Sequence, residues 1–292
     1  MTRIRQALHH QLSASLLLGC LLVSAGCSTR GVQEYAAYRE AFKTTHDASQ
    51  LILDRFAVAE RKVFLETNQR STEFDPDNAR YYVDDIDPPV AASLRQSFAI
   101  TNAYTEALGA LASGESAKQI SEKITEIGTL ATTAGVSVAG VTGSPQIVQA
   151  ATAATKIVDP LKAMEELVEY AFTIRTRKEF RDRLLQDYKT VDDTLIKMSE
   201  ITGPSFELMK WSKYLSSDMS TSGITKAELS ELRSLMANWV VLIEKSRAAL
   251  EGAKIAVETK NFSSSITDFT ITAQELDSAA QNVRRNIAAQ GQ

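Results

Sequence analysis

The sequence predicts an all-α protein, an elongated antiparallel bundle of long helices. Three observations favour this fold class. The 292 residues include only 13 glycines and 6 prolines, the residues that interrupt helices most strongly. The content of 44% hydrophobic and 23% charged residues is that of a globular protein. Apolar residues recur every three or four positions along most of the chain, which is the period of an amphipathic helix.

The first 26 residues have the layout of a secretory signal peptide. The segment contains, in order, Arg3 and Arg5, an apolar run from Leu12 to Val23, and the small residues Ser24, Ala25 and Gly26 before Cys27. Its apolar run is shorter than the roughly 20 residues that a membrane-spanning helix needs, so we expect residues 1–26 to be removed. Residues 27–30 then form a tether, and residues 31–292 form the helical bundle, with a subdivision near residue 159 as an alternative.

The sequence Val-Ser-Ala-Gly-Cys at positions 23–27 resembles the lipobox of bacterial lipoproteins. The resemblance implies that the Cys27 thiol receives a diacylglyceryl group and that a dedicated peptidase cuts just before it. Because Ser28 rather than aspartate follows, it also implies anchoring at the outer membrane. We expect the chain to face the periplasm. Two or three acyl chains anchor a protein durably. The alternatives are a lipobox ending at Cys20 and an ordinary secretory signal with an incidental cysteine.

Cysteine and histidine are too scarce for several kinds of site. The chain contains Cys20, Cys27, His9, His10 and His46, and only His46 lies beyond the predicted signal and lipid attachment site. A zinc site, a disulfide framework or a Cys–His catalytic pair needs more of these residues. We expect His46 on a solvated or boundary face of its helix. The sequence therefore predicts no metal and no cofactor.

Charge argues against nucleic acid as a partner. The formal net charge is −4, and the two charges before residue 28 are both basic, so the mature chain is more acidic still. Nucleic-acid binding calls for a basic surface. The densest basic cluster is interleaved with Glu179 and Asp182 at helical spacing, which predicts a solvated, salt-bridged helix face. Its members are Arg175, Arg177, Lys178, Arg181 and Arg183.

A long first helix is expected from Gly31 to about Arg70. Its apolar stripe, sustained over four heptads, comprises Tyr35, Tyr38, Phe42, Thr45, Ser49, Ile52, Phe56, Ala59 and Val63. At 1.5 Å per residue the helix would be about 60 Å long. The small and polar members of the stripe favour a multi-helix bundle over a two-stranded coiled coil.

The acidic segment 71–89 interrupts the helical pattern. Asp75 and Asp77 begin like an EF-hand loop, but the remaining positions do not match a calcium site. Ala79, Arg80 and Ile86 stand where that loop needs a ligand, a glycine and a glutamate. We therefore expect a loop in which Tyr81 and Tyr82 pack against the end of the bundle.

The second helix is expected to begin after Asp87 as N-cap, with Pro88 and Pro89 in its first turn. Its inward residues are predicted to be Leu94, Phe98, Thr101, Tyr104, Leu108 and Leu111, with Gly114 ending the helix. A capping box from Ser116 to Gln119 opens another helix. The short connection between the two implies an antiparallel hairpin.

Further helical elements follow from the same periodicity. Pro145 restarts a helix, and a second long element extends to about residue 201 with Leu184, Tyr188, Val191, Leu195 and Met198 on its inner face. After Gly203-Pro204 we expect an aromatic turn that contains Phe206, Met209, Trp211 and Tyr214. A capping box from Thr225 to Glu228 opens a long helix, and the last helix begins at about Ser264.

The interval from Ile127 to Thr155 has no charged residue and is rich in Ala, Thr, Val and Gly. One interpretation is a membrane-inserting hairpin, because an uncharged hairpin among long helices resembles the membrane-active element of α-helical pore-forming cytolysins. The other is a buried hairpin whose small residues allow close helix packing, and this one is favoured. Its glycines do not form a phosphate-binding loop, because the required Lys-Ser/Thr is missing after Gly140.

The sequence favours a non-enzymatic protein. Adjacent carboxylates such as Asp192 and Asp193 point about 100° apart on a helix, so they do not form a general acid–base pair. No motif marks a nucleophile. We therefore expect a lipid-anchored envelope protein that acts as a binding or structural module through its helical faces, with another envelope protein as partner. The alternative is a membrane-perturbing protein that uses residues 127–155. The oligomeric state is left open.

Overall fold

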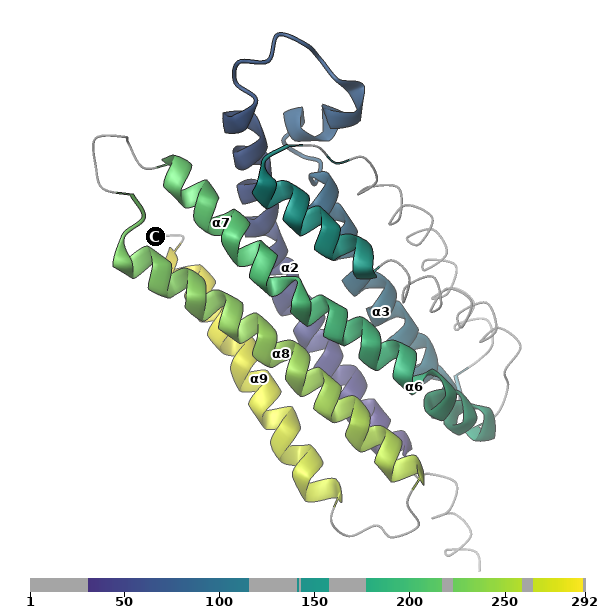
Figure 1. Cartoon of the computed structure of the whole chain (residues 1–292). Coiled ribbons are helices and arrows are strands. Elements are labelled where there is room, and N and C mark those ends of the chain that lie inside the picture. Colours follow the sequence, from purple (N-terminus) through teal and green to yellow (C-terminus); the bar gives the residue numbers. More distant parts are fainter. Residues whose placement is uncertain are drawn as a thin grey trace, which may run out of the picture.

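The computed structural model describes residues 31–115, 141, 143–157, 177–216, 223–258 and 265–290. In these ranges every regular element is a helix, which confirms the all-α class. The long helices lie side by side and form an elongated multi-helix bundle (Figure 1). Cys27, the capping box at Ser116, residue 159 and most of the interval 127–155 lie outside the described residues.

The elements are α2 (Val32–Thr67), the short 3₁₀ helix η1 (Pro76–Tyr82), α3 (Pro89–Ser113), α6 (Arg177–Glu200), α7 (Thr202–Ser216), α8 (Lys226–Glu258) and α9 (Ser265–Gln290), with a further helical segment at 145–157. Figure 1 shows α2, α9 and the successive helices α6 and α7 running in one direction, and α3 and α8 in the other. The antiparallel prediction is therefore correct for α2 and α3 and for α8 and α9.

Helix α2 is the centre of the bundle, because α3, α7, α8 and α9 all pack against it. Every residue of its predicted apolar stripe is buried. Two polar members of that stripe serve packing rather than chemistry: Thr45 Oγ1 lies 2.8 Å from Ser246 Oγ of α8, and Ser49 Oγ accepts a hydrogen bond of 3.1 Å from Trp239 Nε1. Small hydroxyl side chains thus provide hydrogen-bond partners for each other and for a buried indole N–H where α2 and α8 meet.

Helix α3 buries the six residues predicted for its inner face, and Gly114 ends it with φ of +79°. The predicted N-cap is wrong. Pro88 occupies the capping position without a side-chain bond, and the Asp87 carboxylate instead pairs with Arg95 at 2.7 Å. The N–H groups of the first turn are bound by Glu60 of α2, because a tertiary contact supplies the acceptor that a local side chain usually provides.

The predicted aromatic turn after Gly203 is also wrong, because residues 202–216 form the helix α7. Gly203 and Pro204 lie in its first turn, where proline needs no hydrogen-bond partner. The face of α7 that contains Leu208, Met209 and Ser212 is buried. Packing of this face against α2 and α8 thus maintains a helix where Gly203-Pro204 indicated a turn.

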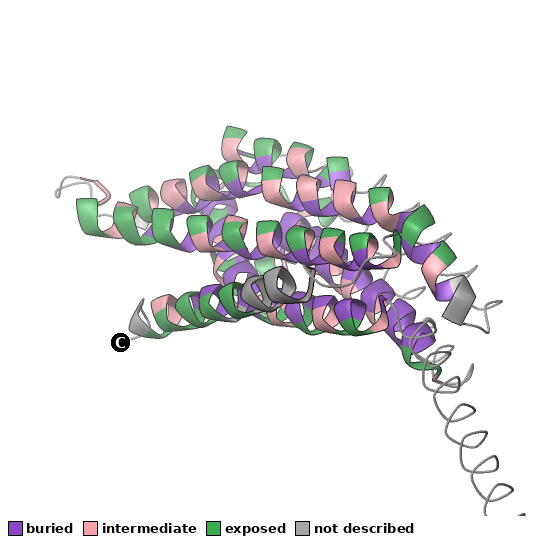
Figure 2. Cartoon of the chain, turned by 90° about the horizontal axis from the view of Figure 1, so that it is seen from below, coloured by how far each residue is buried: buried purple, intermediate pink, exposed green. Residues whose placement is uncertain are grey.

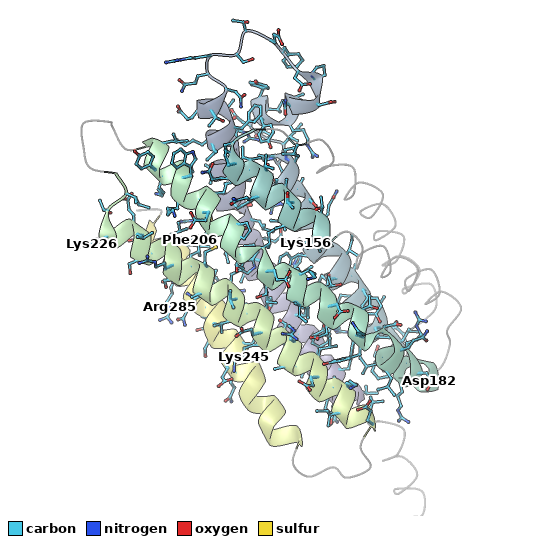
Figure 3. The ribbon with its side chains drawn as sticks, in the orientation of Figure 1. Lys156, Asp182, Phe206, Lys226, Lys245 and Arg285 are labelled. Atoms are coloured by element: carbon cyan, nitrogen blue, oxygen red, sulfur yellow. The ribbon has the colours of Figure 1, made fainter. Side chains whose placement is uncertain are left out.

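Helix α8 begins as predicted with a capping box. Thr225 Oγ1 accepts from the Glu228 N–H at 3.2 Å, and Glu228 Oε2 accepts from the Thr225 N–H at 3.0 Å. On the outer side of the bundle, Lys245 pairs with Glu275 of α9, and Figure 3 places Lys245 near the middle of α8. Viewed from below, each helix presents a buried side inward and exposed residues outward (Figure 2).

Residues 143–157 pack against the main body of the bundle. Their helix begins at Pro145, as predicted, and Ile147, Ala150, Ala154 and Ile157 are buried in the core. Val148 on the other side is exposed. This part of the uncharged interval is thus an amphipathic helix of the bundle. In the described ranges, no helix combines the length and apolar character needed to cross a membrane.

Candidate functional site

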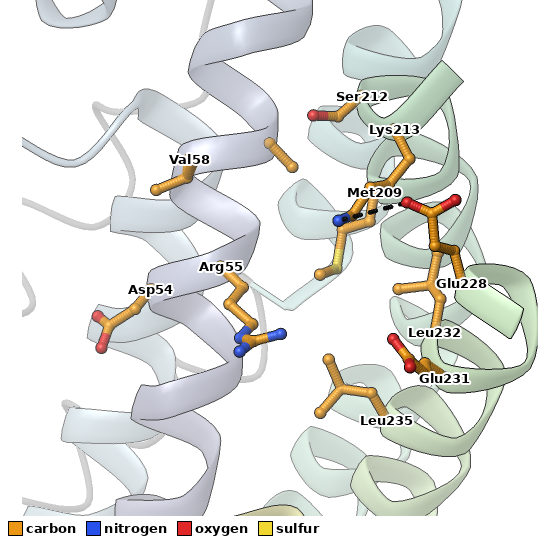
Figure 4. A pocket seen from close by; sticks show the side chains of 11 residues that line it. Asp54, Arg55, Val58, Met209, Ser212, Lys213, Glu228, Glu231, Leu232 and Leu235 are labelled. Carbon is orange, nitrogen blue, oxygen red and sulfur yellow. Dashed lines mark ion pairs between the residues drawn. The ribbon is translucent and has the colours of Figure 1, made fainter. Parts of the chain in front are cut away.

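A groove of about 560 Å³ lies between α2, α7 and α8. It lies toward the end of the bundle at which α2 ends and α8 begins (Figures 1 and 4). The lining residues are Asp54, Arg55, Val58 and Ala59 of α2, Met209, Ser212 and Lys213 of α7, and Glu228, Glu231, Leu232 and Leu235 of α8. We call this feature the α2/α7/α8 groove.

The floor of the α2/α7/α8 groove is apolar. Ala59, Met209, Leu232 and Leu235 are buried members of the hydrophobic core, and they form its outermost layer at this place. Val58 stands at the rim with 66% of its surface exposed, although it is a large apolar side chain on the central helix. The groove therefore offers apolar surface to solvent in a concave shape, which is the usual character of a binding site.

Charged side chains surround this floor. Lys213 Nζ of α7 lies 4.0 Å from Glu228 Oε1 of α8 and so bridges the two walls (Figure 4). Hydrogen bonds from the Thr225 N–H and hydroxyl hold the pKa of Glu228 below its ordinary value. Arg55 donates from Nη2 to the Ile287 carbonyl oxygen of α9 at 3.0 Å. Partial burial lowers the pKa of Arg55, and the nearby Glu231 carboxylate opposes that shift.

Sequence patterns do not reveal this groove, because its residues come from three helices and one of those helices was predicted to be a turn. Met209 and Ser212 face the groove only because α7 is helical. The one available sign is Val58, an apolar residue that lies off the predicted stripe of α2 and is therefore not needed for the core. An off-stripe apolar residue alone is common on protein surfaces.

A second polar site lies beyond the groove, at the end of the bundle. The carboxylate of Glu60, fully buried, accepts from the Tyr81 hydroxyl at 3.0 Å and from the N–H groups of Val90 and Ala91 at 3.1 and 2.8 Å. Burial raises the pKa of Glu60 to about 7, and the three hydrogen bonds oppose this shift. Glu60 thus joins α2, η1 and the start of α3. Sequence reasoning missed it, although an acidic residue four positions after Phe56 and three before Val63, both members of the predicted stripe, was a sign.

The predicted tyrosine contacts are half correct. Tyr81 is buried and stacks on Phe64 of α2, with ring centroids 3.9 Å apart and planes 6° apart. Tyr82 is 49% exposed and meets Phe64 only edge-on. Because the two tyrosines are adjacent in η1, their side chains point in different directions, and only one of them can face the bundle.

The basic cluster predicted to be solvated includes one buried member. Arg183 Nη2 lies 3.1 Å from Asp187 Oδ2, which also accepts from the Tyr104 hydroxyl of α3 at 2.8 Å. Both Arg183 and Asp187 are buried, so the prediction of a solvated face is wrong for Arg183. Burial raises the pKa of Asp187, and Tyr104 and Arg183 oppose this shift. The arginine is buried because it neutralises a carboxylate at the contact between α6 and α3.

Other predicted polar residues lie where helical geometry puts them. Asp192 forms a bidentate pair with Arg247 of α8, with distances of 2.7 and 3.1 Å, whereas the neighbouring Asp193 pairs with Lys189 on the surface. The two carboxylates therefore diverge. His46 lies beside Asp47 and Gln50 at 3.2 and 3.1 Å. Over the ranges that the structure describes, no group of His, Cys, Asp or Glu side chains could hold a metal ion.

Comparisons with protein-family models, with curated proteins and with solved structures find no match for this chain.

Proposed function

We propose that this chain is a lipid-anchored, non-enzymatic binding module of the bacterial cell envelope. In this proposal Cys27 holds it at the outer membrane, facing the periplasm, and the α2/α7/α8 groove binds an apolar segment of another envelope protein. The observation that carries the proposal is the groove, with its apolar floor and charged rim. The anchor and its location rest on the resemblance of residues 23–27 to a lipobox.

The composition of the groove supports a protein segment as ligand. A helix that packs in a groove between helices presents apolar side chains to the floor and polar ones to the rim. Here the floor residues Met209, Leu232 and Leu235 come from two helices, and the rim carries both signs of charge, from Lys213 and Glu231 among others. Such a groove suits an amphipathic segment better than a uniformly charged ligand.

The placement of the titratable groups supports binding rather than catalysis. General acid–base chemistry needs a group with a suitable pKa within hydrogen-bond reach of the reacting atoms. Glu60 and Asp187 have raised pKa values, but their carboxylates face hydrogen-bond donors inside the bundle and neither lines the groove. The carboxylates that do line it lie at the rim, and Glu228 there is bound to Thr225.

The groove can be tested by crosslinking in cells. A photo-crosslinking amino acid at Val58 should give a crosslinked envelope protein, and Val241→Arg should leave that product unchanged, because Val241 is an exposed residue elsewhere on α8. A matched Met209→Arg change should abolish it by placing a charge on the floor. Equal crosslinking at Val58 and at the exposed Ile255 would contradict the proposal.

The anchor can be tested separately by metabolic labelling with a palmitate analogue. We expect label on the wild-type chain and on Cys20→Ala, and none on Cys27→Ala. Labelling lost in Cys20→Ala instead would move the lipid to the alternative lipobox. Absence of label from all three chains would indicate an ordinary secretory signal.

The membrane-perturbing alternative depends on residues 127–155. Within the described part of that interval, Ile147, Ala150 and Ala154 are buried in the bundle, which supports the packing interpretation over insertion. Dye release from liposomes by the purified chain, lost when charges are placed at Val138 and Val148, would favour the alternative. No release over a range of pH and lipid composition would eliminate it.

A further inference from the structure

The connection between α2 and α3, residues 68–88, exposes an unusual amount of apolar surface. We call it the distal loop. Its exposed apolar side chains are Phe74, Tyr82, Val83 and Ile86, with 69%, 49%, 43% and 42% of their surfaces accessible. The Phe74 and Tyr82 rings lie against each other with centroids 6.1 Å apart. Single exposed apolar residues are ordinary, but a concentration of them on one short segment indicates an interaction site.

The distal loop is tied to the bundle at several points. Arg61 of α2 donates to the carbonyl oxygens of Val83 and Asp84 at 2.6 and 2.9 Å, and also to that of Ile86. Glu60 binds the Tyr81 hydroxyl from the other side. Because these bonds hold residues 81–86, the exposed side chains of Tyr82, Val83 and Ile86 are presented in a preorganised arrangement, which lowers the entropy lost on binding.

Within the loop, Asp75 stabilises η1. Its Oδ1 accepts from the Asp77 N–H at 3.0 Å and its Oδ2 accepts from the Asn78 side chain at 2.7 Å. The 3₁₀ helix places Tyr81 and Tyr82 on different sides, so that Tyr81 anchors the loop, whereas about half of Tyr82 stays exposed beside Phe74. The local sequence therefore produces one buried and one exposed aromatic side chain.

The charge of the distal loop indicates the chemistry of its partner. Two arginines, Arg70 and Arg80, stand against six acidic residues, which are Glu73, Asp75, Asp77, Asp84, Asp85 and Asp87. Arg95 neutralises Asp87. The Asp84 carboxylate lies 4.0 Å from Arg61 Nη1, and its side chain is 97% exposed. An acidic surface around exposed aromatic residues is complementary to a basic partner surface that contains apolar pockets.

The distal loop lies far from the N-terminal end of α2. Helix α2 has 36 residues and is therefore about 54 Å long at 1.5 Å per residue. The distal loop lies at one end of this helix and Val32 at the other (Figure 1). A lipid attached at Cys27 would hold the end that contains Val32 at the membrane, so the loop would face the periplasm.

We propose that the distal loop is a second docking surface, separate from the α2/α7/α8 groove, for a protein segment that carries Lys or Arg residues around apolar side chains. Phe74 and Tyr82 insert into the partner, and the carboxylates of the loop pair with its cations. The proposal does not depend on binding in the groove, so each of the two sites can be disproved independently of the other.

The test is crosslinking in cells from the full-length chain, with a photo-crosslinking amino acid at Val83 and, as control, at Ile255, which has similar exposure on α8. We expect a product from Val83 only, joined to a protein segment of net positive charge. Asp77→Lys with Asp85→Lys should lower its yield at least fivefold. Glu244→Lys with Glu251→Lys, an equal change of charge at exposed positions of α8, should not.

A synthetic peptide of the crosslinked segment then measures affinity. We expect the Kd for the full chain to rise at least tenfold on Phe74→Ser and to stay unchanged on Val241→Ser. Three outcomes would overturn the proposal: no product from Val83 above that from Ile255, a product joined to peptidoglycan or to an acidic segment, or a yield insensitive to the charge reversals in the loop. Circular dichroism of each variant shows that it is folded.

Discussion

Two buried carboxylates stabilise different parts of this bundle in different ways. Glu60 of α2 has no cation among its bonded partners and is held by one hydroxyl and two N–H groups at the start of α3. Asp187 of α6 is held by the Arg183 guanidinium and the Tyr104 hydroxyl. The first fastens a loop to the end of the bundle, and the second joins two long helices. A helix N-terminus can thus take the place of a cation as the partner of a buried acid.

The largest effect is expected at the ion pair. Asp187→Ala leaves the Arg183 guanidinium buried without its carboxylate, which should lower the free energy of unfolding by about 3–5 kcal/mol. Denaturant unfolding followed by circular dichroism measures this change. The control is Asp193→Ala, which removes the exposed Lys189–Asp193 pair and should cost less than about 1 kcal/mol. Equal costs for the two variants would show that Asp187 is not stabilised as we describe.

Removal of the Glu60 carboxylate should cost somewhat less. Glu60→Ala leaves the Tyr81 hydroxyl and two N–H groups of α3 without their acceptor, and we expect a loss of about 2–3 kcal/mol. Hydrogen exchange should accelerate in residues 76–92 and stay unchanged in α9, which the carboxylate does not touch. A uniform acceleration over both regions would mean that the effect is global rather than a release of the distal loop.

The pKa of Glu60 predicts a dependence of stability on pH. Burial raises that pKa from its ordinary value of 4.5 to about 7, so the folded chain binds a proton more tightly than the unfolded chain. The contribution of this proton to the free energy of unfolding is therefore fully present below about pH 4.5 and is lost as the pH rises through 7. Relative to Glu60→Gln, which cannot titrate, the wild type should lose on the order of 1–3 kcal/mol between pH 5 and 8. A constant difference between the two chains would contradict the raised pKa.

The smallest effect is expected at the capping box of α8. Thr225→Ala removes the acceptor of the Glu228 N–H and should cost about 1 kcal/mol. Because Thr225 is exposed and bonds only to residues at the start of α8, exchange should increase only in the first turn of α8. Lys226→Ala, one residue further along, should change stability by less than about 0.5 kcal/mol. Equal losses from the two changes would exclude the hydroxyl as the cause.

Sequence periodicity was most successful where a long helix carries a regular apolar stripe. All nine predicted stripe residues of α2 and all six of α3 are buried, because a spacing of three and four places them on one face whatever the partner helix is. The capping box at Thr225 was found for a similar reason, since both of its residues lie within one turn. Local geometry is sufficient for such features.

Sequence-based predictions failed where contacts with distant residues override the local pattern. Asp87 has the right position to cap α3, but Glu60 is already bound to the N–H groups there and Asp87 is bound to Arg95. Arg183 belongs to a charged run that suggests exposure, yet it pairs inside the bundle with Asp187, whose carboxylate also accepts from the Tyr104 hydroxyl. In α7, Gly203-Pro204 suggested a turn, and packing against two helices keeps the following residues helical.

The sequence by itself determined the helical class, the long amphipathic faces and the scarcity of histidine and cysteine, because these depend on residue type and on spacing within a few turns. Tertiary structure alone decided which acids are buried, where the α2/α7/α8 groove opens and which side of η1 faces solvent. Each of these depends on side chains from helices far apart in the chain, and a one-dimensional pattern does not specify which of them meet.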